Sequence, residues 1–125
     1  MGNKFDEFFE LLKLDRKKSP FAKAQTIESR YKELRKEVEE ISYALKKNDF
    51  KNLKEELGDS LLDLFCLMVI TEEKGLFTSK EIVDESIKKL KRRKPWLFKE
   101  GKVTIEEEKK MWYEIKKKEK DLDKR

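Results

Sequence analysis

The strongest constraint on the fold is a run of apolar residues that recur at alternating steps of four and three between residues 27 and 45. An α-helix turns by about 100° per residue, so this spacing places all of them on one face. Charged residues occupy the other positions, which is typical of an amphipathic helix packed against a core. The sequence therefore predicts a long helix beginning near Thr26. The apolar positions are Ile27, Tyr31, Leu34, Val38, Ile41 and Leu45.

Four further helices are predicted by the same kind of pattern. A short one covers residues 3–14, and a second long one runs through residues 53–68, where the latter half is apolar nearly all round. Residues 46–50 form the turn between the two long helices, which must then pack antiparallel. Thr78 with Glu81 and Thr104 with Glu107 form capping-box patterns that open the last two helices, at about 80–93 and 105–119.

Few residues in the chain signal turns, because it contains only four Gly and two Pro among 125 residues. A sandwich or barrel needs a turn every ~8 to 12 residues. We therefore expect an all-α bundle with the two long helices at its centre. Gly58, inside the second of them, costs about 1 kcal/mol relative to Ala, and predicts a close helix crossing.

One domain over residues 1–125 is predicted, with a core at about 5–120 and a charged, fraying tail at 117–125. Although 47% of residues are charged, the apolar ones gather in dense runs such as 61–70, which a disordered chain would lack. The longest apolar run, 64–70, is much shorter than the ~20 residues of a membrane span. No signal-peptide pattern opens the chain. We expect a cytoplasmic protein without a membrane partner.

The complete absence of histidine excludes Ser-His and Cys-His nucleophilic sites and His-ligated zinc sites. The single cysteine, Cys66, lies in an apolar run and is predicted to be a plain core thiol. Charge is unevenly distributed: residues 86–99 carry seven Lys and Arg and no acid, whereas residues 33–63 carry nine acids and six bases. This asymmetry indicates two distinct binding chemistries.

Two acidic stripes flank the apolar faces of the long helices. Glu33, Glu37 and Glu40 belong to the first, and Glu56, Asp59 and Asp63 to the second. In an antiparallel pair the stripes can face each other, and clustered carboxylates repel unless a cation neutralises them. Oxygen ligands without His or Cys suit Mg2+, with Mn2+ as a substitute.

Some acids are better interpreted as solvated surface. Glu33, Glu39 and Glu55 each have a Lys or Arg within one turn. Asp63 differs, because it is the only charged residue between Ser60 and Ile70. A carboxylate in such surroundings needs either a partner or a functional role.

These residues form a familiar pattern. Glu37-x-x-Glu40, followed by the sequence NLKEELGD at 52–59, resembles the MazG family of all-α nucleoside triphosphate pyrophosphohydrolases. The segment KLKRRKPWLF at 89–98, Trp112-x-x-x-Lys116 and the segment 19–26 are also similar to the family pattern. The likeness extends from about residue 5 to 120.

The resemblance implies Mg2+ ligation by the acids, and hydrolysis of nucleoside triphosphates between the α and β phosphates, as nucleotide-pool housecleaning. It also implies a homodimer or a dimer of dimers. Departures are Ala22, where the family often has an acid, Lys94 in place of a frequent His, and Asp63 in place of a common Gln. The implied metal ligands and catalytic residues are Glu37, Glu40, Glu56 and Asp59, with Asp63 as an additional ligand; the implied substrate-binding residues are Lys89, Arg93, Trp112 and Lys116.

Three alternatives remain open at this level. The enzyme could be a narrower dUTP or dCTP pyrophosphatase, or the chain an inactive structural homologue. It could also be a helical module that binds a nucleic acid or another partner through residues 86–99. Facing carboxylates would repel a phosphate backbone, so we expect no nucleic-acid partner.

Overall fold

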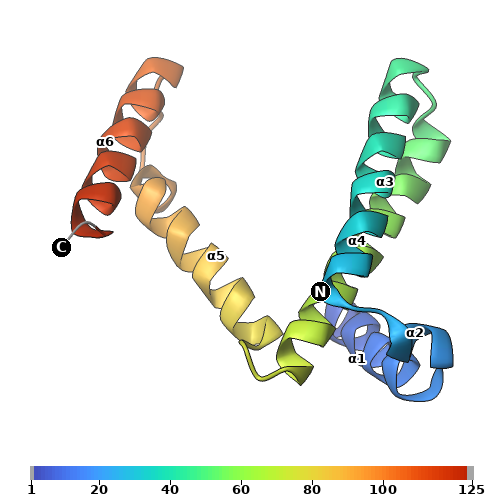
Figure 1. The fold of residues 1–125 in the computed structure, drawn as a ribbon. Helices are drawn as coiled ribbons and strands as arrows, with labels where there is room; N and C mark the ends of the chain where they lie inside the picture. Colours follow the sequence, from blue (N-terminus) through green and yellow to red (C-terminus); the bar gives the residue numbers. More distant parts are fainter. Residues whose placement is uncertain (1, 124–125) are drawn as a thin grey trace. The chain divides into compact units, whose positions relative to one another are not determined.

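The computed structural model describes residues 2–123, and every regular element found there is helical (Figure 1). This confirms the predicted all-α class. None of the described helices combines the length and hydrophobicity that crossing a membrane requires. The elements are α1 (Gly2–Lys18), α2 (Pro20–Ala24), α3 (Ile27–Lys46), α4 (Phe50–Glu73), α5 (Ser79–Arg93), the 3-10 helix η1 (Pro95–Phe98) and α6 (Ile105–Asp123).

The chain divides into two compact units, Met1–Ser79 and Lys80–Arg125, and each is described by itself. The first unit contains helices α1 to α4. The second contains nearly all of α5, together with η1 and α6. The single domain over 1–125 stays a prediction.

The first unit is built on an antiparallel pair of helices, α3 and α4, which lie side by side along their length (Figure 1). The connecting turn is short, and Asn48 adopts a φ of 53° there. The carboxylate of Asp49 then caps α4 by accepting a hydrogen bond from the backbone N–H of Asn52 at 3.1 Å. The predicted pairing of the two long helices is therefore confirmed.

Helix α1 packs on the apolar half of α4 and forms the main core. Phe9 and Leu12 of α1 are buried against Cys66 and Val69 of α4. The ring of Phe65 adds to this contact, with its centroid 5.4 Å from Phe8 and 6.0 Å from Phe9. Cys66 is buried as predicted, and burial raises the pKa of its thiol.

The joint between α1 and α3 is more helical than predicted, since the predicted first helix ended at residue 14. Helix α1 continues to Lys18, and a short helix α2 starts at Pro20. Ser19 between them is extended, with ψ of 121°, because the proline ring disfavours helix at the preceding residue. Arg16 braces the joint by donating hydrogen bonds to the backbone carbonyls of Ala22 and Gln25.

In the second unit, the predicted capping box at the start of α6 is present. The N–H of Glu107 donates to Oγ1 of Thr104 at 3.1 Å, and the N–H of Thr104 donates to the Glu107 carboxylate at 3.3 Å. The predicted end of this helix at residue 119 is wrong, because α6 continues to Asp123. Ion pairs from Arg92 and Arg93 to Glu119 hold its last turns to α5, so the described part of the predicted tail is helical.

Much apolar surface of the first unit is left uncovered. Tyr31, Val38 and Leu45, from the apolar stripe of α3, are each about half exposed. The predicted close crossing at Gly58 is wrong within a single chain, because a Cβ atom built there meets no atom of another helix within 4 Å. Helix α4 alone therefore does not cover the stripe of α3.

Candidate functional site

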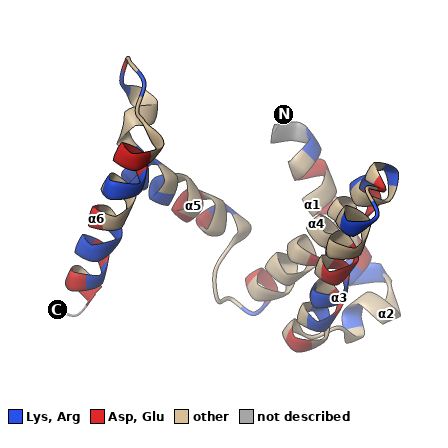
Figure 2. Ribbon diagram, turned by 90° about the horizontal axis from the view of Figure 1, so that it is seen from above, with Lys and Arg blue, Asp and Glu red and all other residues tan. Residues whose placement is uncertain are grey.

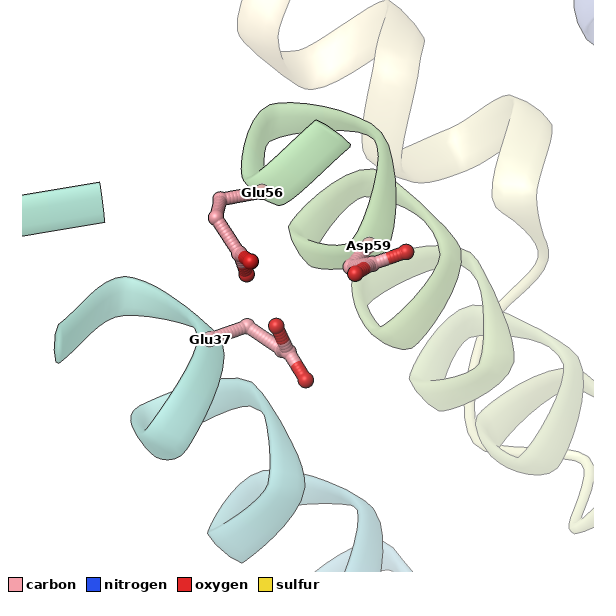
Figure 3. A group of neighbouring side chains, drawn as sticks. All are labelled: Glu37, Glu56 and Asp59. Atoms are coloured by element: carbon pink, nitrogen blue, oxygen red, sulfur yellow. The ribbon is translucent and has the colours of Figure 1, made fainter. Parts of the chain in front are cut away.

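Three carboxylates converge where α3 and α4 face each other (Figure 3). Glu37 comes from α3, and Glu56 and Asp59 come from successive turns of α4. One oxygen of each side chain lies within 4.8 Å of one oxygen of each of the others. The two acidic stripes thus meet as the antiparallel pairing predicted.

The cluster is electrostatically strained without a cation. A hydrogen bond with the carboxyl group of Glu56 raises the pKa of Glu37 to about 7, and burial and the charges of Glu56, Asp59 and Asp63 add to this rise. Oε2 of Glu56 is buried and has no hydrogen-bond partner among the described residues. A buried carboxylate oxygen without a donor is costly. Both observations fit a binding site for a hard divalent cation.

Glu40 lies one turn beyond Glu37 on α3 and is exposed. It is outside the group of three converging carboxylates, so its role as a fourth ligand stays a prediction. Glu33 belongs to the solvated surface, where its carboxylate pairs with Lys36 at 3.3 Å. Glu39 and Glu55 are exposed as well.

Asp63 has a partner that the sequence did not identify. Its Oδ1 lies 3.1 Å from Nη1 of Arg30, and both side chains are largely buried, at 7% and 13% exposed. Burial raises the pKa of Asp63, and the charge of Arg30 opposes that rise. Asp63 was expected to have either a charged partner or a functional role, and the structure shows a partner. Its contribution to a metal site stays a prediction.

In the second unit, cationic side chains surround the ring of Trp112. The guanidinium of Arg93 lies 5.0 Å from the ring centroid, and the ammonium of Lys116 lies 5.9 Å from it. Basic residues form the whole last turn of α5, as the blue end of that helix shows (Figure 2). Lys89 is exposed, one turn before Arg93 on the same helix. The structure thus brings together three of the four predicted substrate-binding residues.

The sequence of the MazG nucleotide pyrophosphohydrolase domain matches residues 25–98 of the chain. This match covers more than half of the chain and includes the whole α3–α4 pair. The chain belongs to the MazG family. All four predicted metal ligands lie within the matched residues, as do Lys89 and Arg93, whereas Trp112 and Lys116 lie beyond them.

A similar protein of known structure agrees with the MazG assignment. The crystal structure of a MazG-related protein from Thermotoga maritima superposes with a TM-score of 0.84 at 34% identity, covering 90% of this chain and 98% of that one. The uncharacterized protein YabN of Bacillus subtilis (strain 168) is 35% identical over 103 residues, which is 82% of this chain. This chain covers only 21% of the length of YabN.

One charged residue of the second unit has no role in the sequence-based account. Glu119 of α6 binds both Arg92 and Arg93. Its position three residues after Lys116 was the available signal, because that spacing puts both side chains on one helix face.

Proposed function

We propose that this MazG-family chain is a Mg2+-dependent nucleoside triphosphate pyrophosphohydrolase. It would hydrolyse (d)NTPs between the α and β phosphates, giving a nucleoside monophosphate and pyrophosphate. The observation that carries the proposal is the convergence of Glu37, Glu56 and Asp59 from two helices, with a buried oxygen of Glu56 lacking a hydrogen-bond partner among the described residues.

Glu37, Glu56 and Asp59 would hold the cation, and Glu40 is one turn away on the same helix. When bound, Mg2+ would neutralise phosphate oxygens and lower the pKa of a coordinated water. A carboxylate that does not coordinate the ion directly would orient the attacking water or accept its proton. Glu37 and Glu56 lie close enough for their carboxyl groups to share a hydrogen bond, which raises the pKa of Glu37 to about 7 and supports a site for a cation.

The basic residues of the second unit would bind the triphosphate. Lys89 and Arg93 are four residues apart on α5 and share a helix face, which suits two contacts to one polyphosphate. Lys116 and Trp112 lie next to Arg93. We propose that these cations hold phosphate oxygens and that the indole helps shape the nucleotide pocket.

A homodimer, or a dimer of dimers, is part of the proposal. Apolar side chains of α3 that are half exposed in one chain would be covered by a second copy. The biological role would be housecleaning of noncanonical or excess nucleotides, and a narrower preference for dUTP or dCTP is one result of the test below.

The test is a screen for pyrophosphate release from canonical and modified (d)NTPs, with Mg2+, Mn2+ or a chelator. We expect release that depends on the metal and that falls by at least ~100-fold in Asp59→Asn, because the variant removes a ligand charge. Glu55→Gln is the matched control, because Glu55 is a neighbouring exposed acid on the same helix. Equal turnover in Asp59→Asn and Glu55→Gln would contradict the assignment of the site.

A further inference from the structure

Glu119 is a partly buried acid in the most basic part of the second unit. It follows Lys116 by three residues and Trp112 by seven, so all three lie on one face of α6. Its side chain is only 20% exposed. The role of Glu119 is therefore indicated by its partners and not by its burial.

Its partners are two arginines from the end of α5. Nε and Nη2 of Arg93 donate to the two carboxylate oxygens at 3.2 to 3.3 Å, which is a side-on, bidentate contact. Nε of Arg92 donates to Oε1 at 2.8 Å. These hydrogen bonds lower the pKa of Glu119, and the one with Arg93 has the larger effect. Glu119 is therefore ionised at neutral pH.

The contact leaves one edge of the Arg93 guanidinium available. Glu119 occupies the edge formed by Nε and Nη2, whereas Nη1 has no partner among the described residues. The side chain of Arg93 is 15% exposed, and its guanidinium lies over Trp112. Arg93 is therefore held on one edge by a carboxylate and on one face by an indole.

The charges in this group also favour anion binding. Two arginines share one carboxylate, so the three side chains together keep a positive charge, to which Lys116 adds. Glu119 does not occupy all the hydrogen-bond donors of Arg93. Its carboxylate contacts Nε and Nη2, so Nη1 remains able to donate to a phosphate oxygen.

We infer that Glu119 is a positioning residue, which holds the Arg93 guanidinium so that its Nη1 edge binds a phosphate oxygen of the substrate. This inference rests on the proposed function, because it assigns Glu119 to the triphosphate-binding part of that activity. Glu119 itself touches the arginines and not the substrate.

The test is Glu119→Gln, which keeps the side-chain shape and removes the charge. We expect KM for the nucleoside triphosphate to rise by about tenfold, with kcat changed by less than about twofold, because a charge-assisted contact to Arg93 is lost. Glu119→Asp, which keeps the charge, should raise KM less than Glu119→Gln does. Glu114→Gln is the matched control, because it makes the same charge change at an exposed position of the same helix.

An Arg93→Ala background shows whether Glu119 acts through Arg93. In that background Glu119→Gln should have no further effect on KM, whereas a purely structural role for Glu119 would give additive losses. Unchanged KM in Glu119→Gln, a lower KM, or additive losses in the double variant would each overturn the inference.

Binding of a non-hydrolysable α,β-methylene nucleoside triphosphate, measured by calorimetry in the presence of a chelator, separates the two proposals. If the wild-type chain binds this probe but releases no pyrophosphate from any nucleotide, the proposed function fails alone. The role of Glu119 is then decided by affinity for the probe, which should weaken about tenfold in Glu119→Gln and stay unchanged in Glu114→Gln.

Discussion

At the scale of single residues, the pair of Arg30 and Asp63 shows how an apolar helix accommodates a charge. A buried carboxylate is tolerated because a guanidinium 3.1 Å away compensates it. Replacing Arg30 with Met should lower the free energy of unfolding by about 3 to 5 kcal/mol, since Asp63 would remain buried without its cation. Urea denaturation measures this change.

Lys36→Met is the control for that experiment. It removes a pair of similar length, Lys36 with Glu33, but on the exposed face of α3, and should change stability by less than about 1 kcal/mol. Adding Asp63→Asn to Arg30→Met should recover much of the lost stability. No recovery would mean that the cost lies in packing around Arg30 and not in the unpaired charge.

Glu37 makes stability depend on pH in the metal-free protein. Its pKa is raised from the ordinary value of 4.5 to about 7, so the folded state binds a proton more tightly than the unfolded chain does. The free energy of unfolding should therefore fall as pH rises from about 4.5 to about 7, and level off above that range. Denaturation at a series of pH values in a chelator measures this slope, and Glu37→Gln should flatten it. A slope of opposite sign would contradict the close carboxyl contact.

A residue's role can be predicted from sequence when it depends on neighbouring residues in the chain. Helical spacing and a short turn are enough to predict that two acidic stripes face each other, and the resemblance to the MazG family selects Glu37, Glu56 and Asp59 among their members. The role of Arg30 was missed, because Arg30 and Asp63 are 33 residues apart in sequence. Their pairing depends on the register of two packed helices. Glu119 lacked a role for a similar reason, since its arginines come from another helix.

At the scale of helices, Gly58 provides a sharp test. A Cβ atom at this position meets nothing within 4 Å, so Gly58→Ala should raise the free energy of unfolding of a single chain by up to about 1 kcal/mol. Gly75→Ala is the contrasting variant, because Gly75 has a φ of +71°. This substitution should lower the free energy of unfolding by about 1 kcal/mol. Thermal or urea unfolding of both variants checks the difference in sign. A loss of stability in Gly58→Ala would indicate that another copy packs closely there.

The helices themselves were predictable from periodicity and capping, but some of their ends were not. Ser19-Pro20 and Thr104 mark boundaries through local chemistry, and the structure has boundaries there. The end of α6 was placed too early, because the sequence beyond 116 shows mainly charge. Ion pairs to α5 stabilise that segment, and no pattern within the segment itself reveals them.

At the scale of the whole molecule, the net charge of +5 conceals two opposed groups of residues. The carboxylate cluster belongs to the first unit and the basic residues around Trp112 to the second. A uniformly basic surface would suit a nucleic acid, whereas separate acidic and basic groups suit a metal ion and a polyphosphate.

The uncovered stripe of α3 predicts self-association. We expect sedimentation at micromolar concentration to give a dimer or tetramer mass, and Leu45→Glu to shift it toward the monomer, because Leu45 is half exposed in one chain. Glu55→Gln, a change at an exposed polar site, should leave the mass unchanged. A wild-type chain that sediments as a monomer at all concentrations would contradict this expectation.

The proposed activity requires that carboxylates on facing helices bind a metal and support cleavage between the α and β phosphates. Phosphorus NMR identifies the products when the wild-type chain or the Glu56→Gln variant is incubated with a nucleoside triphosphate and Mg2+. We expect equal amounts of nucleoside monophosphate and pyrophosphate from the wild type, and neither product in a chelator or from Glu56→Gln. Release of a nucleoside diphosphate and inorganic phosphate, or turnover unaffected by a chelator, would rule out this activity.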